Sequence, residues 1–173
     1  MGVDDLRNRI RAIPDFPKPG ILFRDITPLL ADGPSFHQAI DSLAERYLDQ
    51  RIDVVVGVEA RGFIMGSAVA YALRAGNILI RKCGKLPYKT HRTTYALEYG
   101  TDTLEIHQDA IRAGQRVLIA DDLLATGGTI SAAIELVEQL GGKIIEVAFL
   151  IELTALKGRD RLKGYPVFSL IQY

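Results

Sequence analysis

Short runs of aliphatic and β-branched residues alternate along the chain with stretches in which apolar side chains recur every three or four positions. The continuous apolar runs occupy residues 54–58, 78–80, 117–120 and 144–151. Helical spacing lies between them at 65–73 and 130–140, and before them at 34–48. Strands that are apolar on both faces and alternate with helices predict an α/β fold: a doubly wound, mostly parallel sheet with helices on both faces.

Two stretches depart from this alternation. Residues 14–30 hold four of the seven prolines, which predicts an irregular, structured segment rather than a helix; we refer to it as the hood. Residues 84–109 are polar, with strand-like pieces at 94–97 and 103–106. A long polar insertion in a compact domain is usually a lid, a binding loop or disorder, and we expect a flexible lid at about 88–107. The length of 173 residues fits one domain spanning 1–173.

Composition narrows the classes of function. Lys plus Arg and Asp plus Glu both number 21, and this zero net charge argues against a dedicated nucleic-acid binder. The single cysteine, Cys83, excludes an internal disulfide framework and any Cys-rich zinc site. No apolar run approaches the ~18 residues of a membrane span, and the first residues lack the apolar core of a signal peptide. We therefore expect a cytoplasmic protein that contacts neither nucleic acid nor membrane.

The strongest chemical signal is the segment VLIADDLLATGGT at 117–129. Two carboxylates, Asp121 and Asp122, follow an apolar strand, and a Thr-Gly-Gly-Thr turn opens the next helix. Ligands bind at this edge of an open parallel sheet, where glycines let backbone amides converge and the helix N-terminus favours an anion. The turn therefore suits a phosphate monoester, and the acids suit sugar hydroxyls or a divalent ion held by the substrate. The alternative is that the acids are solvated and the glycines only turn the chain.

This segment resembles the phosphoribosyl-pyrophosphate (PRPP) motif of the type I phosphoribosyltransferases. The resemblance implies that Asp121 and Asp122 contact the ribose hydroxyls. It also implies that the 5′-phosphate is held by the residues of the turn, Ala125, Thr126, Gly127, Gly128 and Thr129.

Four further segments are similar to the adenine phosphoribosyltransferases: FPKPGILFRD at 16–25, EARGF at 59–63, RKCGKLP at 81–87 and YALEYG at 95–100. The likeness spans essentially the whole chain. It implies transfer of the 5-phosphoribosyl group of PRPP to N9 of adenine, giving AMP and pyrophosphate. It further implies Mg²⁺ carried mainly by the substrate, with no direct protein cage, and a homodimer.

The EARG segment follows a strand and starts a helix, so it predicts a second amide-lined anion site with its own guanidinium; the alternative is an arginine on a helix surface. In the family this loop holds pyrophosphate, which assigns Glu59, Ala60 and Arg61, and often has a cis peptide, here between Glu59 and Ala60. Residues 81–97 contain several basic side chains and no acid, so they predict countercharge for pyrophosphate. The basic residues that the motif assigns to pyrophosphate are Arg81, Lys82 and Lys85. For Lys89 and Arg92, the alternative is that they lie on a solvated face.

The base site rests mainly on the resemblance. Phe23 offers an aromatic face to a planar base, with Leu22 and Arg24 beside it and Leu123 on the opposite face; on spacing alone Phe23 is more often a core residue. In the family the acid at Glu98 assists proton movement at N7 of the purine, and Tyr99 belongs to the lid. An edge-strand carboxylate in water is the alternative for Glu98.

Three other functions stay open at this level. A phosphoribosyltransferase for another base would keep the phosphate turn and change only the hood and lid. A non-catalytic PRPP-sensing protein would need an attached DNA-binding segment, for which 173 residues leave little room. The third is an unrelated sugar-phosphate binder.

Overall fold

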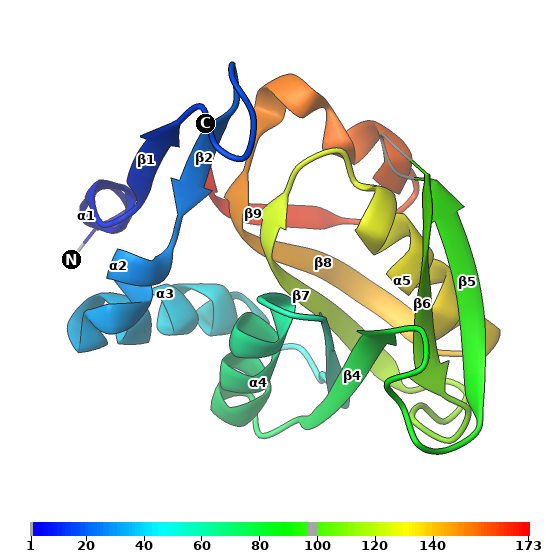
Figure 1. Ribbon diagram of the computed structural model, residues 1–173. Helices are drawn as coiled ribbons and strands as arrows, with labels where there is room; N and C mark the ends of the chain where they lie inside the picture. The colour runs from blue at the N-terminus through cyan, green and yellow to red at the C-terminus, as the bar shows by residue number, and fades with distance from the viewer. Residues whose placement is uncertain (1, 97–99) are drawn as a thin grey trace.

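The computed structural model describes residues 2–96 and 100–173, and its central feature is one twisted sheet (Figure 1). Within the described residues the strand order is β5-β6-β4-β3-β7-β8-β9. The strands are β3 (Val54–Val58), β4 (Gly76–Lys82), β5 (Thr90–Ala96), β6 (Thr101–His107), β7 (Arg116–Leu124), β8 (Lys143–Glu152) and β9 (Val167–Gln172). From β4 to β9 all neighbours are parallel, whereas β6 and β5 continue the sheet in antiparallel order.

Helices cover both faces of the sheet, which confirms the doubly wound α/β fold. Helices α3 (Gly33–Ala44) and α4 (Gly62–Ala72) pack on one face, and α5 (Gly128–Gln139) packs on the other (Figure 1). The apolar run of strand β7 contributes side chains to the core on both faces of the sheet. Leu118 belongs to the core cluster beneath α3 and α4, whereas its neighbour Ile119 belongs to the cluster beneath α5. Successive side chains of a strand point to opposite faces, so both layers require the run to be apolar throughout.

The hood is more regular than the prolines predict. Helix α1 (Val3–Asn8) is followed by an antiparallel pair, β1 (Arg11–Pro14) and β2 (Leu22–Asp25), and by the short helix α2 (Thr27–Ala31). The prediction of an irregular segment at 14–30 was therefore wrong for β2 and for the start of α2. The prolines are compatible with these elements because Pro14 ends β1 and Pro28 lies in the first turn of α2, where no amide donor is needed.

The predicted lid at 88–107 is largely a β-hairpin. Strands β5 and β6 pair from Thr90↔His107 to Ala96↔Thr101, and β6 joins β4 through Arg81↔Glu105. Leu104 is buried in the core cluster under α5. The strand-like pieces were thus predicted correctly but too short, and the described part of the segment is an extension of the sheet rather than a free loop. Residues 97–99 lie outside the described residues.

Several boundaries differ from the prediction. Strand β7 continues four residues beyond Ala120, because its pairing with β8 runs on to Leu124↔Glu152. The helix predicted at 34–48 ends at Ala44 and gives way to the 3-10 helix η1 (Glu45–Tyr47). Two further 3-10 helices, η2 (Thr154–Leu156) and η3 (Gly158–Leu162), precede β9. Within the described residues, every helix is too short or too polar to traverse a lipid bilayer.

Candidate active site

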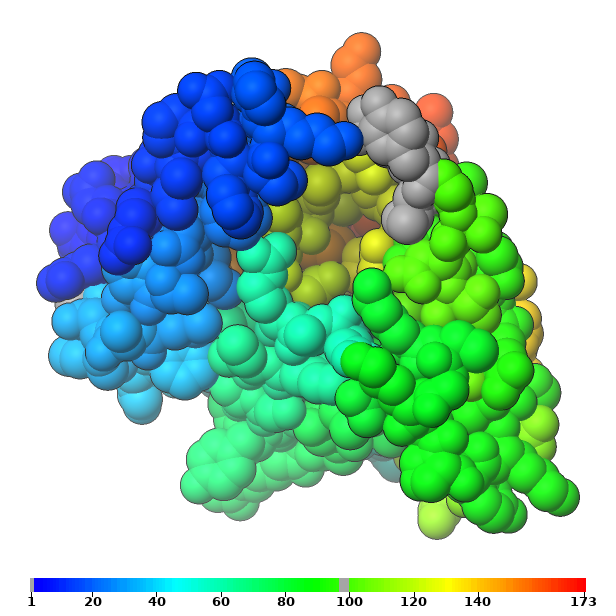
Figure 2. All heavy atoms as spheres, viewed as in Figure 1, coloured from blue at the N-terminus to red at the C-terminus, as the bar shows by residue number. Residues whose placement is uncertain are grey.

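A cavity of ≈ 220 Å³ lies at the carboxyl ends of β3 and β7. These strands are parallel neighbours, paired through Gly57↔Ala120, so the segments that follow them meet at one edge of the sheet. Figure 2 shows this face hollowed between the hood and the β5–β6 hairpin, with the yellow segment of β7 and the following turn at its floor. The lining residues are Val58, Glu59, Ala60, Arg61, Asp121, Asp122, Leu123, Leu124, Ala125, Thr126, Gly127, Gly128, Thr129 and Ile130.

The Thr-Gly-Gly-Thr turn places backbone amides at the N-terminus of α5. Gly127 adopts φ 83°, the left-handed region that favours glycine, and α5 begins at Gly128. A Cβ at Gly127 would lie 2.6 Å from the main-chain oxygen of Gly158, so η3 closes the back of the turn. The amide of Ser131 donates to the main-chain oxygen of Gly127 at 2.9 Å. The amides that precede it at the start of α5 have no acceptor inside the helix, as at any helix N-terminus. Such a helix start binds an anionic group.

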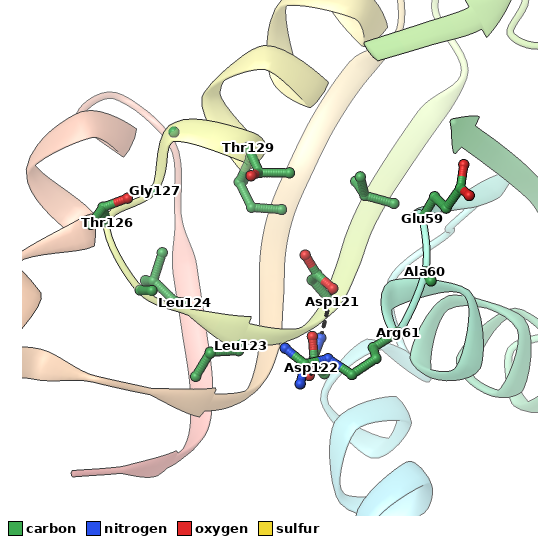
Figure 3. A pocket seen from close by; sticks show the side chains of 14 residues that line it. Glu59, Ala60, Arg61, Asp121, Asp122, Leu123, Leu124, Thr126, Gly127 and Thr129 are labelled. Atoms are coloured by element: carbon green, nitrogen blue, oxygen red, sulfur yellow. Dashed lines mark hydrogen bonds and ion pairs between the residues drawn. The ribbon is translucent and has the colours of Figure 1, made fainter. Parts of the chain in front are cut away.

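The two acids lie within β7 rather than after it, so they project to opposite sides of the strand (Figure 3). The Asp122 carboxylate is buried and pairs with Arg61, with 2.8 Å between Nε and Oδ2. Asp121 accepts a hydrogen bond of 2.9 Å from the Asp122 amide. Burial and the neighbouring Asp122 charge raise the pKa of Asp121 well above its ordinary value. Burial also raises the pKa of Asp122, but the Arg61 charge opposes this rise, so the pKa of Asp121 is raised more strongly than that of Asp122.

The second loop has the geometry that the resemblance implies. The Glu59–Ala60 peptide bond is cis, as predicted, and Arg61 is the N-cap of α4. A Cβ at Gly62 would lie 2.6 Å from Oδ1 of Asp121, so glycine permits this loop to lie directly against β7. Arg61 points toward Asp122, while Glu59 extends away along the other wall (Figure 3). The loop therefore contacts both the acid pair and the basic segment that begins at the end of β4.

The basic segment is charge-compensated in space. Glu59 Oε1 lies 2.6 Å from Lys85 Nζ, and its Oε2 lies 3.3 Å from Arg81 Nε. The Lys85 hydrogen bond, supported by the Lys82 amide and Arg81, lowers the pKa of Glu59 to about 2. The Lys82 ammonium turns instead to Asp102 of β6, at 3.2 Å. The local sequence contained no sign of these acidic partners, because Glu59 and Asp102 both lie outside residues 81–97.

Arg92 has a clear structural partner. Its Nε donates to Oε2 of Glu105 at 2.9 Å, across the hairpin. Glu105 is fully buried, and its carboxylate also accepts from the amides of Gly84 and Lys85 and from the Thr90 hydroxyl. This cluster joins β5, β6 and the segment after β4. The sequence missed Glu105 as its centre, because an acid within an amphipathic strand gives no local sign of burial.

Three consecutive hood residues do not present their side chains together. Phe23 is half-buried beside a cavity of ≈ 400 Å³, in edge-to-face contact with Phe16 at 5.2 Å and with Cζ of Arg61 5.6 Å from its ring centroid. Leu22 is exposed. The Arg24 guanidinium lies 3.7 Å from the ring centroid of Tyr173. Strand alternation explains this separation, and only Phe23 of the three lines the cavity.

The remaining predicted site residues divide into two groups. Leu123 lines the cavity beside the phosphate turn. Glu98 and Tyr99 lie outside the described residues. The hairpin nevertheless reaches the turn, because the Thr129 hydroxyl donates to the Tyr95 hydroxyl at 3.5 Å. Sequence reasoning missed both Tyr95 and Gly158, whose contacts with the turn join segments distant in the chain.

The chain is similar to known proteins over nearly its full length. A family model described as the phosphoribosyl transferase domain matches residues 29–172. The chain is 63% identical over 171 residues to the adenine phosphoribosyltransferase of Syntrophotalea carbinolica, covering 99% of this chain and 100% of that protein.

Solved structures agree with this likeness. The adenine phosphoribosyltransferase of Thermoanaerobacter pseudethanolicus superposes with a TM-score of 0.96 at 51% identity, over 99% of each chain. That of Saccharomyces cerevisiae, solved in complex with an imino-altritol 1,6-bisphosphate and adenine, gives a TM-score of 0.92 at 44% identity, over 97% of each chain.

Proposed function

The chain belongs to the phosphoribosyltransferase family and, within it, to the adenine phosphoribosyltransferases, and from this premise we propose that it transfers the 5-phosphoribosyl group of PRPP to N9 of adenine. The products are AMP and pyrophosphate, so the chain is a glycosyltransferase of purine salvage. One observation carries the assignment of the site. The phosphate turn, the acid pair and the Glu-Ala-Arg-Gly loop line a single cavity at one sheet edge. The yeast relative, bound to adenine and a sugar-like bisphosphate, supports the same pair of substrates.

In the proposed complex the 5′-phosphate lies on the turn formed by Ala125, Thr126, Gly127, Gly128 and Thr129. The amides at the start of α5 donate to its oxygens, and the helix dipole favours its charge. The ribose then extends toward Asp121 and Asp122. The side-chain oxygens of Asp121 and Asp122 are suited to hydrogen-bond the ribose hydroxyls, and Arg61 holds the Asp122 carboxylate in place.

Pyrophosphate leaves toward Glu59, Ala60, Arg61, Arg81, Lys82 and Lys85. The bond between C1′ and the pyrophosphate oxygen breaks, the ring gains oxocarbenium character, and the leaving anion needs countercharge. Glu59 has a supporting part in this arrangement, because its carboxylate holds Arg81 and Lys85 at the cavity wall. The acids of β7 favour the developing positive charge on the ribose ring.

We propose that Mg²⁺ enters with PRPP and is bound mainly by diphosphate and ribose oxygens. Carboxylate oxygens of Asp121 and Asp122 line the same cavity and are of the type that Mg²⁺ prefers. Across residues 2–96 and 100–173, no group of three or more His, Cys, Asp or Glu is placed to hold a metal. The ion neutralises charge on the diphosphate when bound.

Adenine binds on the hood side, against Phe23, with Leu123 on the opposite face. The backbone of Leu22 and Arg24 can read the exocyclic amine, because consecutive strand residues present amides and carbonyls even where their side chains point away. As N9 bonds to C1′, the proton on N7 leaves, and we assign its removal to Glu98, with Tyr99 on the lid. Glu98→Ala is then expected to lower kcat about 100-fold or more while the Kd for AMP changes little. An unchanged kcat would remove Glu98 from the chemistry.

We also propose a cytoplasmic homodimer. An apolar groove lies between α3 and α4, and its rim carries the exposed side chains of Ile64 and Tyr71. A second copy of this chain covering the groove would remove these apolar groups from water.

The decisive experiment is a panel of bases. Adenine, hypoxanthine, guanine, xanthine and uracil are each incubated with PRPP and Mg²⁺, and pyrophosphate release is measured. The proposal expects release with adenine only. Release with another base would move the chain to a different specificity. PRPP or AMP binding without turnover of any base would favour a PRPP-sensing protein or a sugar-phosphate binder.

A further inference from the structure

The ring of Tyr173 contacts two guanidinium groups, one from the hood and one from α1. Cζ of Arg24, in β2, is 3.7 Å from the ring centroid, and Cζ of Arg7, in α1, is 4.9 Å from it. Both distances are within the range of cation–π attraction. Figure 1 shows the C-terminal end of the chain beside β2. Tyr173 therefore connects the last strand of the sheet with the hood.

The backbone of Tyr173 is fixed to the sheet edge that carries the active site. Its amide donates to the main-chain oxygen of Glu152 at 2.9 Å, and its own main-chain oxygen accepts from the amide and hydroxyl of Thr154. Leu153, between these two residues, donates to the main-chain oxygen of Leu124 at 2.9 Å. Leu124 directly precedes the phosphate turn. A series of main-chain hydrogen bonds thus connects the phosphate turn with Tyr173. The aromatic ring of Tyr173 in turn contacts Arg24 of the hood.

Strand β2 carries this contact to the base site. Arg24 and Phe23 are consecutive, so their side chains leave β2 on opposite faces. On one face Arg24 stacks on Tyr173; on the other, Phe23 lies beside Arg61, which pairs with Asp122 of β7. The strand is held from both faces by groups anchored in the sheet.

We propose that Tyr173 is a positioning residue: it fixes β2, through Arg24, at the distance from the phosphate turn that lets Phe23 stack on adenine while PRPP is bound. This inference rests on the proposed function for its substrate. It assigns the Arg24 side chain to Tyr173 rather than to the base.

The aromatic ring, rather than the hydroxyl, makes this contact. The Tyr173 hydroxyl is buried and has no hydrogen-bond partner within residues 2–96 and 100–173. A buried hydroxyl without a partner contributes nothing favourable, so phenylalanine keeps the function of the residue. Leucine removes the π face and with it the attraction to Arg24.

The test compares Tyr173→Leu with the matched control Tyr173→Phe in steady-state kinetics with adenine and PRPP. Tyr173→Leu is expected to raise the KM for adenine about threefold to tenfold, the loss expected for a partly exposed cation–π contact, and to leave the KM for PRPP unchanged. Tyr173→Phe is expected to behave as the wild type. Arg24→Met is expected to reproduce the effect of Tyr173→Leu, and the double variant is expected to be no worse than either single one. Equal rises in both KM values, equal damage by Phe and Leu, or additive effects would overturn the proposal.

Amide hydrogen exchange gives a readout independent of turnover. Tyr173→Leu, or Arg24→Met if the first variant does not fold, is expected to speed exchange in β1 and β2 while β7 keeps its protection. Unchanged exchange in β2 would overturn the proposal that Tyr173 positions this strand. Wild-type protein that forms no AMP from adenine would instead refute the proposed function, and the exchange result would still decide whether Tyr173 holds the hood.

Discussion

At the scale of single residues, the phosphate turn depends on a position that only glycine satisfies. Gly127 combines φ 83° with a main-chain oxygen 2.6 Å from the place of a Cβ. The oxygen belongs to the backbone of η3, so it cannot swing aside as a side-chain tip would. The turn is therefore shaped by two independent restrictions, one conformational and one steric.

Gly127→Ala is expected to raise the KM for PRPP at least tenfold and to destabilise the fold by more than the ~1–2 kcal/mol of left-handed strain alone. Gly114→Ala is the matched control, because Gly114 has φ 84° and nothing within 4 Å of its Cβ position. The control is expected to show the strain in thermal unfolding and to keep its kinetics. Equal kinetics in the two variants would mean that the back of the turn does not shape the site.

The raised pKa of Asp121 predicts that this residue lowers the free energy of unfolding as pH rises, which is the reverse of the usual effect of an aspartate. The folded-state pKa of Asp121 is raised, so the native state binds more protons than the unfolded state above the unfolded pKa of 3.8. The contribution of Asp121 to the free energy of unfolding is therefore favourable below pH 3.8. It decreases as pH rises from 3.8 toward the folded-state pKa, because the buried carboxyl must then ionise or hold its proton against solvent.

Asp121→Asn is expected to be more stable than the wild type at pH 7 in urea unfolding, and this advantage is expected to shrink toward pH 3.5. Asparagine keeps an oxygen that can accept from the Asp122 amide. The variant is also expected to bind PRPP poorly. Asp122→Asn is the control. It removes the charged partner of Arg61, so its free energy of unfolding at pH 7 is expected to increase less than that of Asp121→Asn. A wild type more stable than Asp121→Asn at pH 7 would show that the buried charge is compensated.

At the scale of elements, the β5–β6 hairpin shows what local sequence conveys and what it omits. The alternation of polar and apolar residues was sufficient to place two strand-like pieces. Their partners were not predictable, because Glu105 meets Arg92 only after the hairpin has formed its register. The same limit applies to Gly158 behind Gly127 and to Tyr173 beneath Arg24. Each pair joins segments that no window of sequence contains together.

Arg92→Met tests whether this part of the hairpin is structural. The change leaves the buried Glu105 carboxylate without its guanidinium partner, and it is expected to cost about 1–3 kcal/mol in urea unfolding at pH 7. The KM for PRPP is expected to stay within twofold of the wild type. Lys89→Met is the control, because no ion pair joins Lys89 to any described residue. A large rise in the KM for PRPP with an unchanged free energy of unfolding would instead indicate that Arg92 binds pyrophosphate.

At the scale of the whole molecule, the layers of the fold follow from the sequence because each layer repeats one simple pattern. Apolar runs such as Val54–Val58 form strands buried on both faces, and helices of period 3.6 cover them. The phosphate turn could be placed for the same reason, since it directly follows such a strand. The hood was predicted poorly because it packs on the edge of this frame, where prolines and turns dominate the local pattern.

The apolar groove between α3 and α4 predicts how the chain assembles. Tyr71 is 88% exposed at the rim of the groove between α3 and α4, which is large for an aromatic side chain. If a second copy covers this groove, a charge there costs the full desolvation of an unpaired carboxylate. Tyr71→Glu is therefore expected to convert a dimer to a monomer in sedimentation velocity.

Leu48→Glu is the control. It changes an apolar residue that is 65% exposed and lies outside the groove, so it is expected to leave the dimer intact. Dissociation by Leu48→Glu alone would place the interface elsewhere, and a wild-type monomer at micromolar concentration would refute the homodimer.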